Sequence, residues 1–118
     1  IFGDGKQVRD MLHISDVVRA YELGIENIDA LSGTALNLGG GAANTLSIWS
    51  EFGAMLEEMS GNAVTVDWGD WRPGDQKVFV ADISRAAALM GWKPTVSPVD
   101  GVHDLYRWVS ANRELFGG

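Results

Sequence analysis

Apolar residues along this chain change repeatedly between the spacing of an amphipathic helix and the two-residue alternation of a half-buried strand. Helical spacing covers Val17–Ile28, Ile48–Met59 and Val99–Val109, and alternation covers Val64–Trp68 and Val78–Val80. The two patterns follow one another with no internal repeat, linker or low-complexity segment, which is typical of α/β architecture. We therefore predict that the chain, residues 1–118, forms a single α/β domain.

Capping residues and glycines predict where the elements begin and end. The expected helix starts are Asp16, Ser47, Asp82 and Ser97, and the expected helix ends are Gly61 and Gly91. Ser97 is followed by a proline and, at the third position, by an acid, which is a strong helix start. Further short extended segments are expected at Val8–Ile14 and Ala35–Leu38, and the second runs into a turn of three glycines, residues 39–41.

Composition excludes several classes of partner and site. The formal net charge is -7 and the basic residues form no cluster, so we expect no nucleic-acid partner. The chain has no cysteine, and His13 and His103 lack metal-ligand spacing, so we expect neither disulfides nor a bound metal. No apolar run approaches the roughly 20 residues of a membrane-spanning helix. We expect a soluble chain with no membrane partner, and the cytoplasm is the default location.

The stretch Arg72-Pro73-Gly74-Asp75 has the composition of a type II β-turn, with proline at its second position and glycine at its third. Such a turn brings Arg72 and Asp75 together. A guanidinium suits bidentate binding of phosphate, a carboxylate can accept hydrogen bonds from ribose hydroxyls, and Trp68 and Trp71 could form walls. The alternative is a solvent-facing turn with an ion pair worth under about 1 kcal/mol. Spacing alone does not decide between the two.

Two other segments contain candidate binding residues. Arg9 follows a glycine turn, and it is either a second phosphate ligand or a partner of Asp10 in a solvated pair. The three-glycine turn leads to Asn44, whose amide can bond either backbone or ligand. The turn differs from a dinucleotide fingerprint, because Asn44 replaces the third glycine and no acid ends a second strand about 20 residues later. A structural turn explains these glycines, and a mononucleotide site that needs Gly41 is the alternative.

Several motifs occur in a characteristic order along the chain. They are Gly3-Asp4-Gly5-Lys6-Gln7-Val8-Arg9-Asp10 continuing to His13-Ile14-Ser15-Asp16-Val17, then Asn37-Leu38-Gly39-Gly40, Arg72-Pro73-Gly74-Asp75, and Leu89-Met90-Gly91-Trp92-Lys93-Pro94. Together they resemble the carboxy-terminal half of the extended short-chain dehydrogenase/reductase family, the NAD-dependent nucleotide-sugar epimerases and dehydratases. The likeness covers practically the whole chain. The stretch from Trp71 to Val80 is most similar to the CDP-paratose 2-epimerase-like branch.

The resemblance implies roles for individual residues. In the family, the arginines that match Arg9 and Arg72 bind the diphosphate of the substrate, and the acid that matches Asp75 hydrogen-bonds the nucleotide ribose. Asn44 and Trp71 are further candidates for the same pocket. The resemblance also implies an NAD cofactor in the full-length parent.

The same resemblance implies that the catalytic machinery lies elsewhere. In the family, a tyrosine four residues before a lysine and a glycine-rich cofactor fingerprint both precede this region. Tyr21 is followed at that spacing by Ile25, and Tyr106 by Ser110. We therefore expect this chain to have no catalytic residue and no cofactor site of its own.

The motifs and the composition predict one role for the whole chain and leave one alternative. We predict the substrate-binding α/β portion of an extended short-chain dehydrogenase/reductase, lacking the dinucleotide-binding Rossmann half, from a parent that is an isomerase or a lyase. Its partners would be a nucleotide-diphosphate sugar, the missing amino-terminal Rossmann domain and a second copy of itself in a homo-oligomer, because the uncovered surfaces would be apolar. The alternative is a free-standing, non-catalytic interaction or assembly module derived from the same family.

Overall fold

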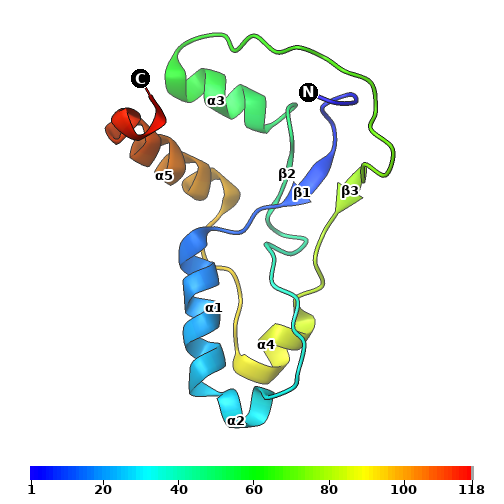
Figure 1. Cartoon of the computed structure of the whole chain (residues 1–118), viewed down its shortest axis with the longest axis vertical. Helices are drawn as coiled ribbons and strands as arrows, with labels where there is room; N and C mark the ends of the chain where they lie inside the picture. Colours follow the sequence, from blue (N-terminus) through cyan, green and yellow to red (C-terminus); the bar gives the residue numbers. More distant parts are fainter. Residues whose placement is uncertain (118) are drawn as a thin grey trace.

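Three short strands form a mixed sheet in the computed structural model, which describes residues 1–117 (Figure 1). They are β1 (Val8–Asp10), β2 (Thr45–Ser47) and β3 (Val78–Phe79). The sheet order is β2-β1-β3, with β1 antiparallel to β2 and parallel to β3. Arg9 therefore lies on the central strand, opposite Leu46 on one side and Phe79 on the other.

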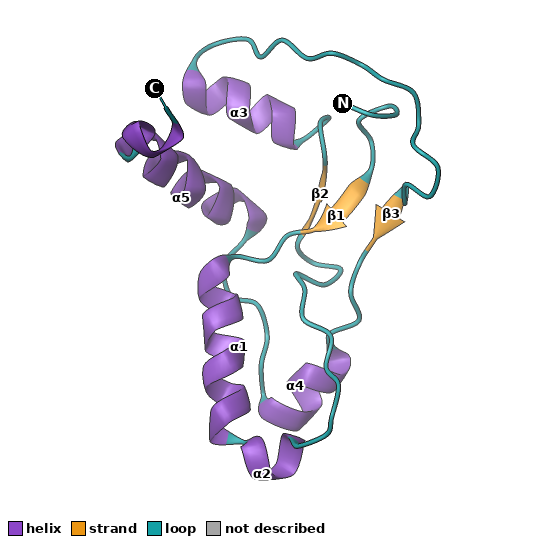
Figure 2. Cartoon of the chain, in the orientation of Figure 1, coloured by secondary structure: helices purple, strands orange, loops and turns teal. Residues whose placement is uncertain are grey.

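Two groups of helices flank the sheet (Figure 2). The helices are α1 (Ile14–Glu26), α2 (Ile28–Leu31), α3 (Phe52–Ser60), α4 (Ser84–Met90), α5 (Pro98–Ala111) and the 3-10 helix η1 (Arg113–Phe116). In the view of Figure 1, α1, α2 and α4 lie together below the strands, whereas α3 and α5 lie to one side. A long loop, residues 62–77, leads from α3 to β3 and arches past the amino terminus.

A small core lies between α1 and α4. Ala20, Ala86 and Trp92 are buried there, and partly buried apolar residues pack on them: Leu12, Leu23, Leu38, Ile83 and Met90. The indole N–H of Trp92 donates a hydrogen bond to the carbonyl oxygen of Asp16 at 2.9 Å. The segment after α4 is thereby joined to α1 through both apolar contact and a hydrogen bond.

Asp16 is a buried carboxylate at the edge of this core. It accepts hydrogen bonds from the amides of Thr95 and Val96 at 2.9 and 3.0 Å, from the Thr95 hydroxyl at 2.8 Å and from Arg19 at 2.9 Å. Burial alone would raise the pKa of Asp16, but the hydrogen bonds outweigh burial and lower the pKa to about 2. The ionised carboxylate therefore links the first turn of α1 to the chain after α4.

Several predicted helix boundaries are confirmed. α5 begins directly after Ser97, whose hydroxyl accepts the backbone N–H three residues further on. α3 and α4 end at Gly61 and Gly91, whose φ angles of 68° and 65° lie in the left-handed region. The predicted cap of α1 is wrong, because His13 caps the helix and Asp16 is its third residue.

Ser47 and Asp82 were predicted as helix caps, but α3 and α4 begin further along the chain, after Glu51 and Ile83. Both predicted residues still bond backbone amides near the helix starts. Ser47 ends β2 and exchanges two hydrogen bonds with Glu51, the residue before α3. Asp82 accepts the amide of Ser84, the first residue of α4, while Ile83 occupies the cap position. Both side chains satisfy backbone amides that would otherwise lack a partner near the helix start.

The strands differ more from the prediction than the helices do. Within residues 1–117, Ala35–Leu38 and Val64–Trp68 form no strand, because no neighbouring segment pairs with them. Thr45–Ser47, for which only a helix cap at Ser47 was predicted, forms β2 by pairing with β1. A strand needs a partner for its backbone groups, so a local pattern is not sufficient to form one.

The chain is more extended than a compact domain of its length. Its radius of gyration is 16.9 Å, whereas a compact domain of this length has a radius of about 13.5 Å. Its accessible surface is 7934 Å², against about 6,200 Å² for a compact monomer of the same mass. Large apolar side chains are correspondingly exposed, among them Ile14, Tyr21, Ile25, Leu105, Trp108 and Phe116.

Candidate functional site

Residues 72–75 form the predicted type II turn. The amide of Asp75 donates to the carbonyl oxygen of Arg72 at 3.1 Å, and Gly74 has a φ of 82°. Arg72 donates from Nε and Nη2 to the two carboxylate oxygens of Asp75 at 3.1 and 3.0 Å. These hydrogen bonds and the charge of Asp75 raise the pKa of the Arg72 guanidinium. The Arg72 side chain is 60% exposed, so the turn presents an oriented cation to solvent.

Two cations of the 62–77 loop lie over aromatic rings. The Cζ atom of Arg72 is 4.6 Å from the ring centroid of Phe2. The Nζ atom of Lys77 is 5.5 Å from the ring of Trp71. Both distances are within the range of cation–π attraction. Arg72 is thus held by a carboxylate within its own turn and by a ring from the opening turn, residues 1–7.

The predicted wall residues Trp68 and Trp71 pack on glycines of the opening turn. A Cβ atom on Gly3 would lie 2.8 Å from the ring of Trp71, and one on Gly5 would lie 3.0 Å from the ring of Trp68. Such distances leave no room for a side chain at either glycine. The two tryptophans therefore attach the 62–77 loop to the opening turn.

Arg9 lies on β1, and its Nη1 donates to the carbonyl oxygen of Val8 at 2.8 Å. Asp10, the alternative partner suggested by the sequence, instead accepts the amides of Gly41 and Ala81, each at 3.1 Å. Within the described residues, no ion pair joins Arg9 to a carboxylate. The structure brings Arg72 and Asp75 together. Within residues 1–117, no hydrogen bond joins Arg9 to the turn that contains them.

The three-glycine turn packs against protein atoms. A Cβ atom on Gly39 would lie 2.3 Å from Oδ2 of Asp10, and one on Gly40 would lie 2.1 Å from the carbonyl oxygen of Met11. Asn44 donates from Nδ2 to the carbonyl oxygen of Gly40 at 2.8 Å. The close approach of the backbone to the end of β1 explains these glycines, and the Asn44 amide supports the turn itself.

Gln7 is a buried residue of the opening turn that the sequence did not single out. It is 4% exposed, and its Nε2 donates to the carbonyl oxygen of Phe2 at 2.5 Å. Its Oε1 is buried with no hydrogen-bond partner within residues 1–117. A glutamine beside a short strand is usually exposed, so the sequence carried no signal that distinguished this amide from a surface one.

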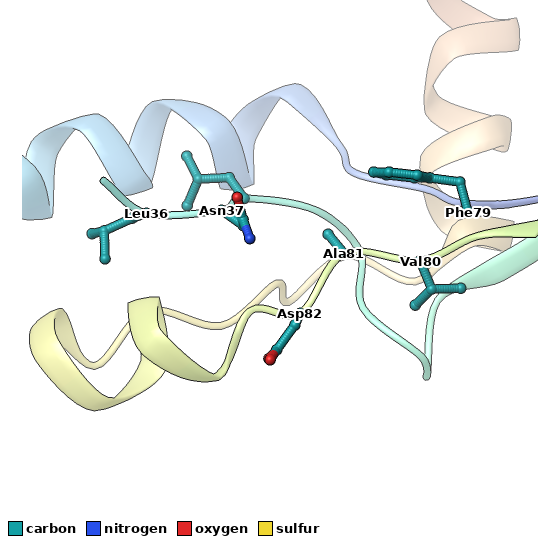
Figure 3. A pocket seen from close by; sticks show the side chains of 7 residues that line it. Leu36, Asn37, Phe79, Val80, Ala81 and Asp82 are labelled. Atoms are coloured by element: carbon teal, nitrogen blue, oxygen red, sulfur yellow. The ribbon is translucent and has the colours of Figure 1, made fainter. Parts of the chain in front are cut away.

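Two hollows lie outside the turn. One, with a volume of about 380 Å³, lies between the segments 36–38 and 79–82 (Figure 3). The other, of about 1030 Å³, lies between the start of α1, α3 and α5, and its wall is mainly apolar. Its apolar lining includes Met11, Leu12, Ile48, Phe52, Leu105 and Trp108. Neither lining includes Arg9, Arg72 or Asp75.

Residues 1–117 provide neither a metal site nor a membrane-spanning helix. No group of three or more His, Cys, Asp or Glu side chains is placed to hold a metal ion there. None of the helices formed by these residues is long and apolar enough to cross a membrane.

Comparison with known proteins agrees on one family. A family model described as GDP-mannose 4,6 dehydratase matches residues 1–105. The chain is 39% identical to CDP-paratose 2-epimerase of Salmonella typhi over 111 residues, which cover 94% of this chain and 32% of that protein. It is 36% identical to UDP-glucuronate 4-epimerase of Thermodesulfobacterium geofontis over 115 residues, which cover 98% of this chain and 34% of that protein.

Solved structures give the same result. UDP-glucuronic acid 4-epimerase from Bacillus cereus, in complex with UDP-glucuronic acid and NAD, superposes with a TM-score of 0.84 at 36% identity. The match covers 94% of this chain and 34% of that one. The chain therefore spans about a third of the length of the relatives it matches. This match, together with the α/β fold and the ordered motifs, shows that the chain belongs to the GDP-mannose 4,6-dehydratase family of NAD-dependent nucleotide-sugar epimerases and dehydratases, within the extended short-chain dehydrogenases/reductases.

Proposed function

We propose that this chain is the nucleotide-diphosphate-sugar-binding part of an NAD-dependent epimerase or dehydratase. The observation that carries the proposal is the exposed guanidinium of Arg72, which Asp75 and the ring of Phe2 hold in one orientation. A planar, pre-oriented guanidinium is suited to bind phosphate oxygens in pairs. Because Asp75 uses only part of its acceptor capacity on Arg72, it can still accept a hydrogen bond from a ribose hydroxyl.

Arg9 is the second proposed diphosphate ligand. Its guanidinium makes one hydrogen bond to its own strand, through Nη1, and has further N–H groups that can bind phosphate. Two arginines would supply the positive charge that a diphosphate requires in a chain with a net charge of -7. We propose Trp71 and Asn44 as additional residues of the pocket.

We propose that catalysis and NAD binding belong to the rest of a longer parent, an isomerase or lyase. Neither tyrosine of this chain is followed by a lysine at the family's spacing. The packed glycines at 39 and 40 offer little access for a dinucleotide or mononucleotide pyrophosphate. The chain alone would therefore bind substrate without converting it.

An amino-terminal Rossmann domain is the proposed cover for the exposed apolar side chains. The accessible surface exceeds that of a compact monomer by about 1,700 Å². One partner in a standard protein–protein interface buries about 800 Å². The excess is thus large enough for an extensive contact with further polypeptide.

Calorimetry with UDP and with UDP- and CDP-sugars tests the proposed site. Arg72→Ala should weaken UDP binding by about tenfold or more, because a charge-assisted hydrogen-bond pair to phosphate is lost. Arg107→Ala is a matched control, since Arg107 forms the same type of pair with an acid three residues away but lies on α5. Equal affinity of the Arg72→Ala variant and the unchanged chain would refute the role of Arg72.

A second candidate function is a non-catalytic assembly module that forms a homo-oligomer. The exposed apolar side chains of α5, Leu105 and Trp108, favour it, because they lie in the apolar hollow of about 1030 Å³. A module of this kind would show no affinity for UDP, whereas the binding part of an enzyme would show affinity for UDP that depends on Arg72. UDP affinity therefore separates the candidates.

A further inference from the structure

We infer that Gln7 and Phe2 are positioning residues for Arg72. The buried amide of Gln7 holds the backbone of Phe2, and the ring of Phe2 supports the guanidinium. The inference deepens the proposed function and rests on it, because Arg72 matters here as a diphosphate ligand.

The first contact in this arrangement is the hydrogen bond from Gln7 Nε2 to the carbonyl oxygen of Phe2, at 2.5 Å. The carbonyl is an acceptor, so it fixes which end of the Gln7 amide faces it. The other end, Oε1, is buried without a partner within residues 1–117. A buried acceptor without a partner lowers stability. The amide is therefore poorly explained by stability alone, and its one side-chain hydrogen bond goes to the residue beneath Arg72.

The second contact joins Phe2 to the loop that carries Arg72. Hydrogen bonds from Gly69 to Ile1, at 2.8 Å, and from Gly3 to Gly69, at 2.9 Å, enclose Phe2 in a backbone bridge. A Cβ atom on Gly69 would lie 3.1 Å from the Phe2 ring, so the ring packs closely on this glycine. The same ring lies 4.6 Å from Cζ of Arg72.

These contacts connect the two proposed diphosphate ligands. Gln7 lies directly before β1, two residues from Arg9, and its carbonyl oxygen accepts the amide of Ile48 at 2.8 Å. Gln7 is thus fixed to the sheet on one side and to Phe2 on the other. The position of Arg72 relative to Arg9 then depends on the Gln7–Phe2 contact as well as on the turn that contains Arg72.

The test compares Gln7→Met, Phe2→Leu and the double variant in the full chain. The Nε proton of Arg72 should resonate upfield of its position in Phe2→Leu, because Cζ, the atom bonded to Nε, lies 4.6 Å from the centroid of the Phe2 ring. We expect Phe2→Leu to abolish this shift and Gln7→Met to reduce it. UDP affinity should fall about two- to fivefold in each single variant, the size expected for an exposed cation–π contact. The double variant should bind no more weakly than Phe2→Leu alone, since both changes act through one contact.

Gln76→Met is the matched control, because Gln76 is exposed in the same loop. It should change neither the Arg72 signal nor UDP affinity. Thermal unfolding separates positioning from folding, because Gln7→Met also removes the unpaired Oε1 and should keep the melting temperature close to that of the unchanged chain. Phe2→Leu alters a residue that is 49% exposed and provides a second test if Gln7→Met does not fold.

The outcomes are distinguishable. If the unchanged chain binds UDP and Gln7→Met leaves both the Arg72 signal and the affinity unaltered, the positioning role is refuted. If the unchanged chain does not bind UDP, the proposed function is refuted, and the Arg72 signal still decides whether Gln7 orients the guanidinium.

Discussion

Asp16 shows how one buried carboxylate can link segments that are far apart in the sequence. Its partners Thr95 and Val96 lie 79 and 80 residues away, and its carboxylate has few contacts with solvent. The sequence predicted Asp16 as a helix cap, because a cap is recognised from neighbouring residues. The partners of a buried carboxylate lie far along the chain, and the sequence does not reveal them. The lowered pKa shows that the folded chain favours the ionised form.

Stability should therefore fall in acid over a defined range of pH. The pKa of Asp16 is lowered from 3.8 to about 2 on folding. The resulting stabilisation, about 2 kcal/mol, is fully present above a pH of about 4 and is lost as the pH falls through about 2. Urea unfolding measured across this range would show the loss as a fall in the free energy of unfolding.

Asp16→Asn should lower the free energy of unfolding at neutral pH by about 2 to 3 kcal/mol, because it removes charge and one acceptor from a buried network. The same substitution should also reduce the fall in the free energy of unfolding between about pH 4 and pH 2. Asp29→Asn, at an exposed position in α2, is the control and should change little. An unchanged acid dependence in Asp16→Asn would contradict the role given to this carboxylate.

At the scale of elements, helices followed the sequence more closely than strands. The Ser97 start of α5 and the Gly61 end of α3 depend on local hydrogen bonds and φ angles, so local residues predicted them. β2 and the unpaired segment Ala35–Leu38 depend instead on which segments become neighbours. The Arg72–Asp75 turn was predictable for the same local reason, whereas the contact of Gln7 with Phe2 required the folded opening turn.

Two glycines inside helices should respond oppositely to alanine. Gly24 in α1 has open space where a Cβ would lie, so Gly24→Ala should raise the free energy of unfolding by about 0.5 to 1 kcal/mol. A Cβ on Gly53 in α3 would lie 2.7 Å from the ring of Trp49. Gly53→Ala should therefore lower the free energy of unfolding by about 1 to 3 kcal/mol. Chemical denaturation of both variants checks the signs, and stabilisation by Gly53→Ala would contradict the packing described for α3.

For the molecule as a whole, the extended shape explains why many apolar side chains are exposed. A chain with a radius of gyration of 16.9 Å buries few large side chains, and Trp92 is the bulkiest of those fully buried among the described residues. Surfaces of this kind normally contact further polypeptide. The chain spans about a third of the length of its relatives, and we propose that the rest of a longer parent covers these surfaces.

Self-association should follow when this chain is studied alone. We expect light scattering to show an average mass that rises with concentration. Leu105→Glu on α5 should reduce this rise in mass, because it places a charge in the apolar hollow. Ala88→Glu, at an exposed position on α4, is the control. A strictly monomeric mass at high concentration would argue against the homo-oligomer.

We propose that Arg9 and Arg72 bind one diphosphate, and nuclear magnetic resonance of the arginine Nε–H groups during a UDP titration tests this proposal. The Arg9 and Arg72 signals should shift together along one saturation curve. Arg85, which donates to a backbone carbonyl as Arg9 does, and Arg107, which pairs with an acid as Arg72 does, should stay unchanged. Signals of Arg9 and Arg72 that remain still at saturating UDP, or that follow different curves, would contradict it.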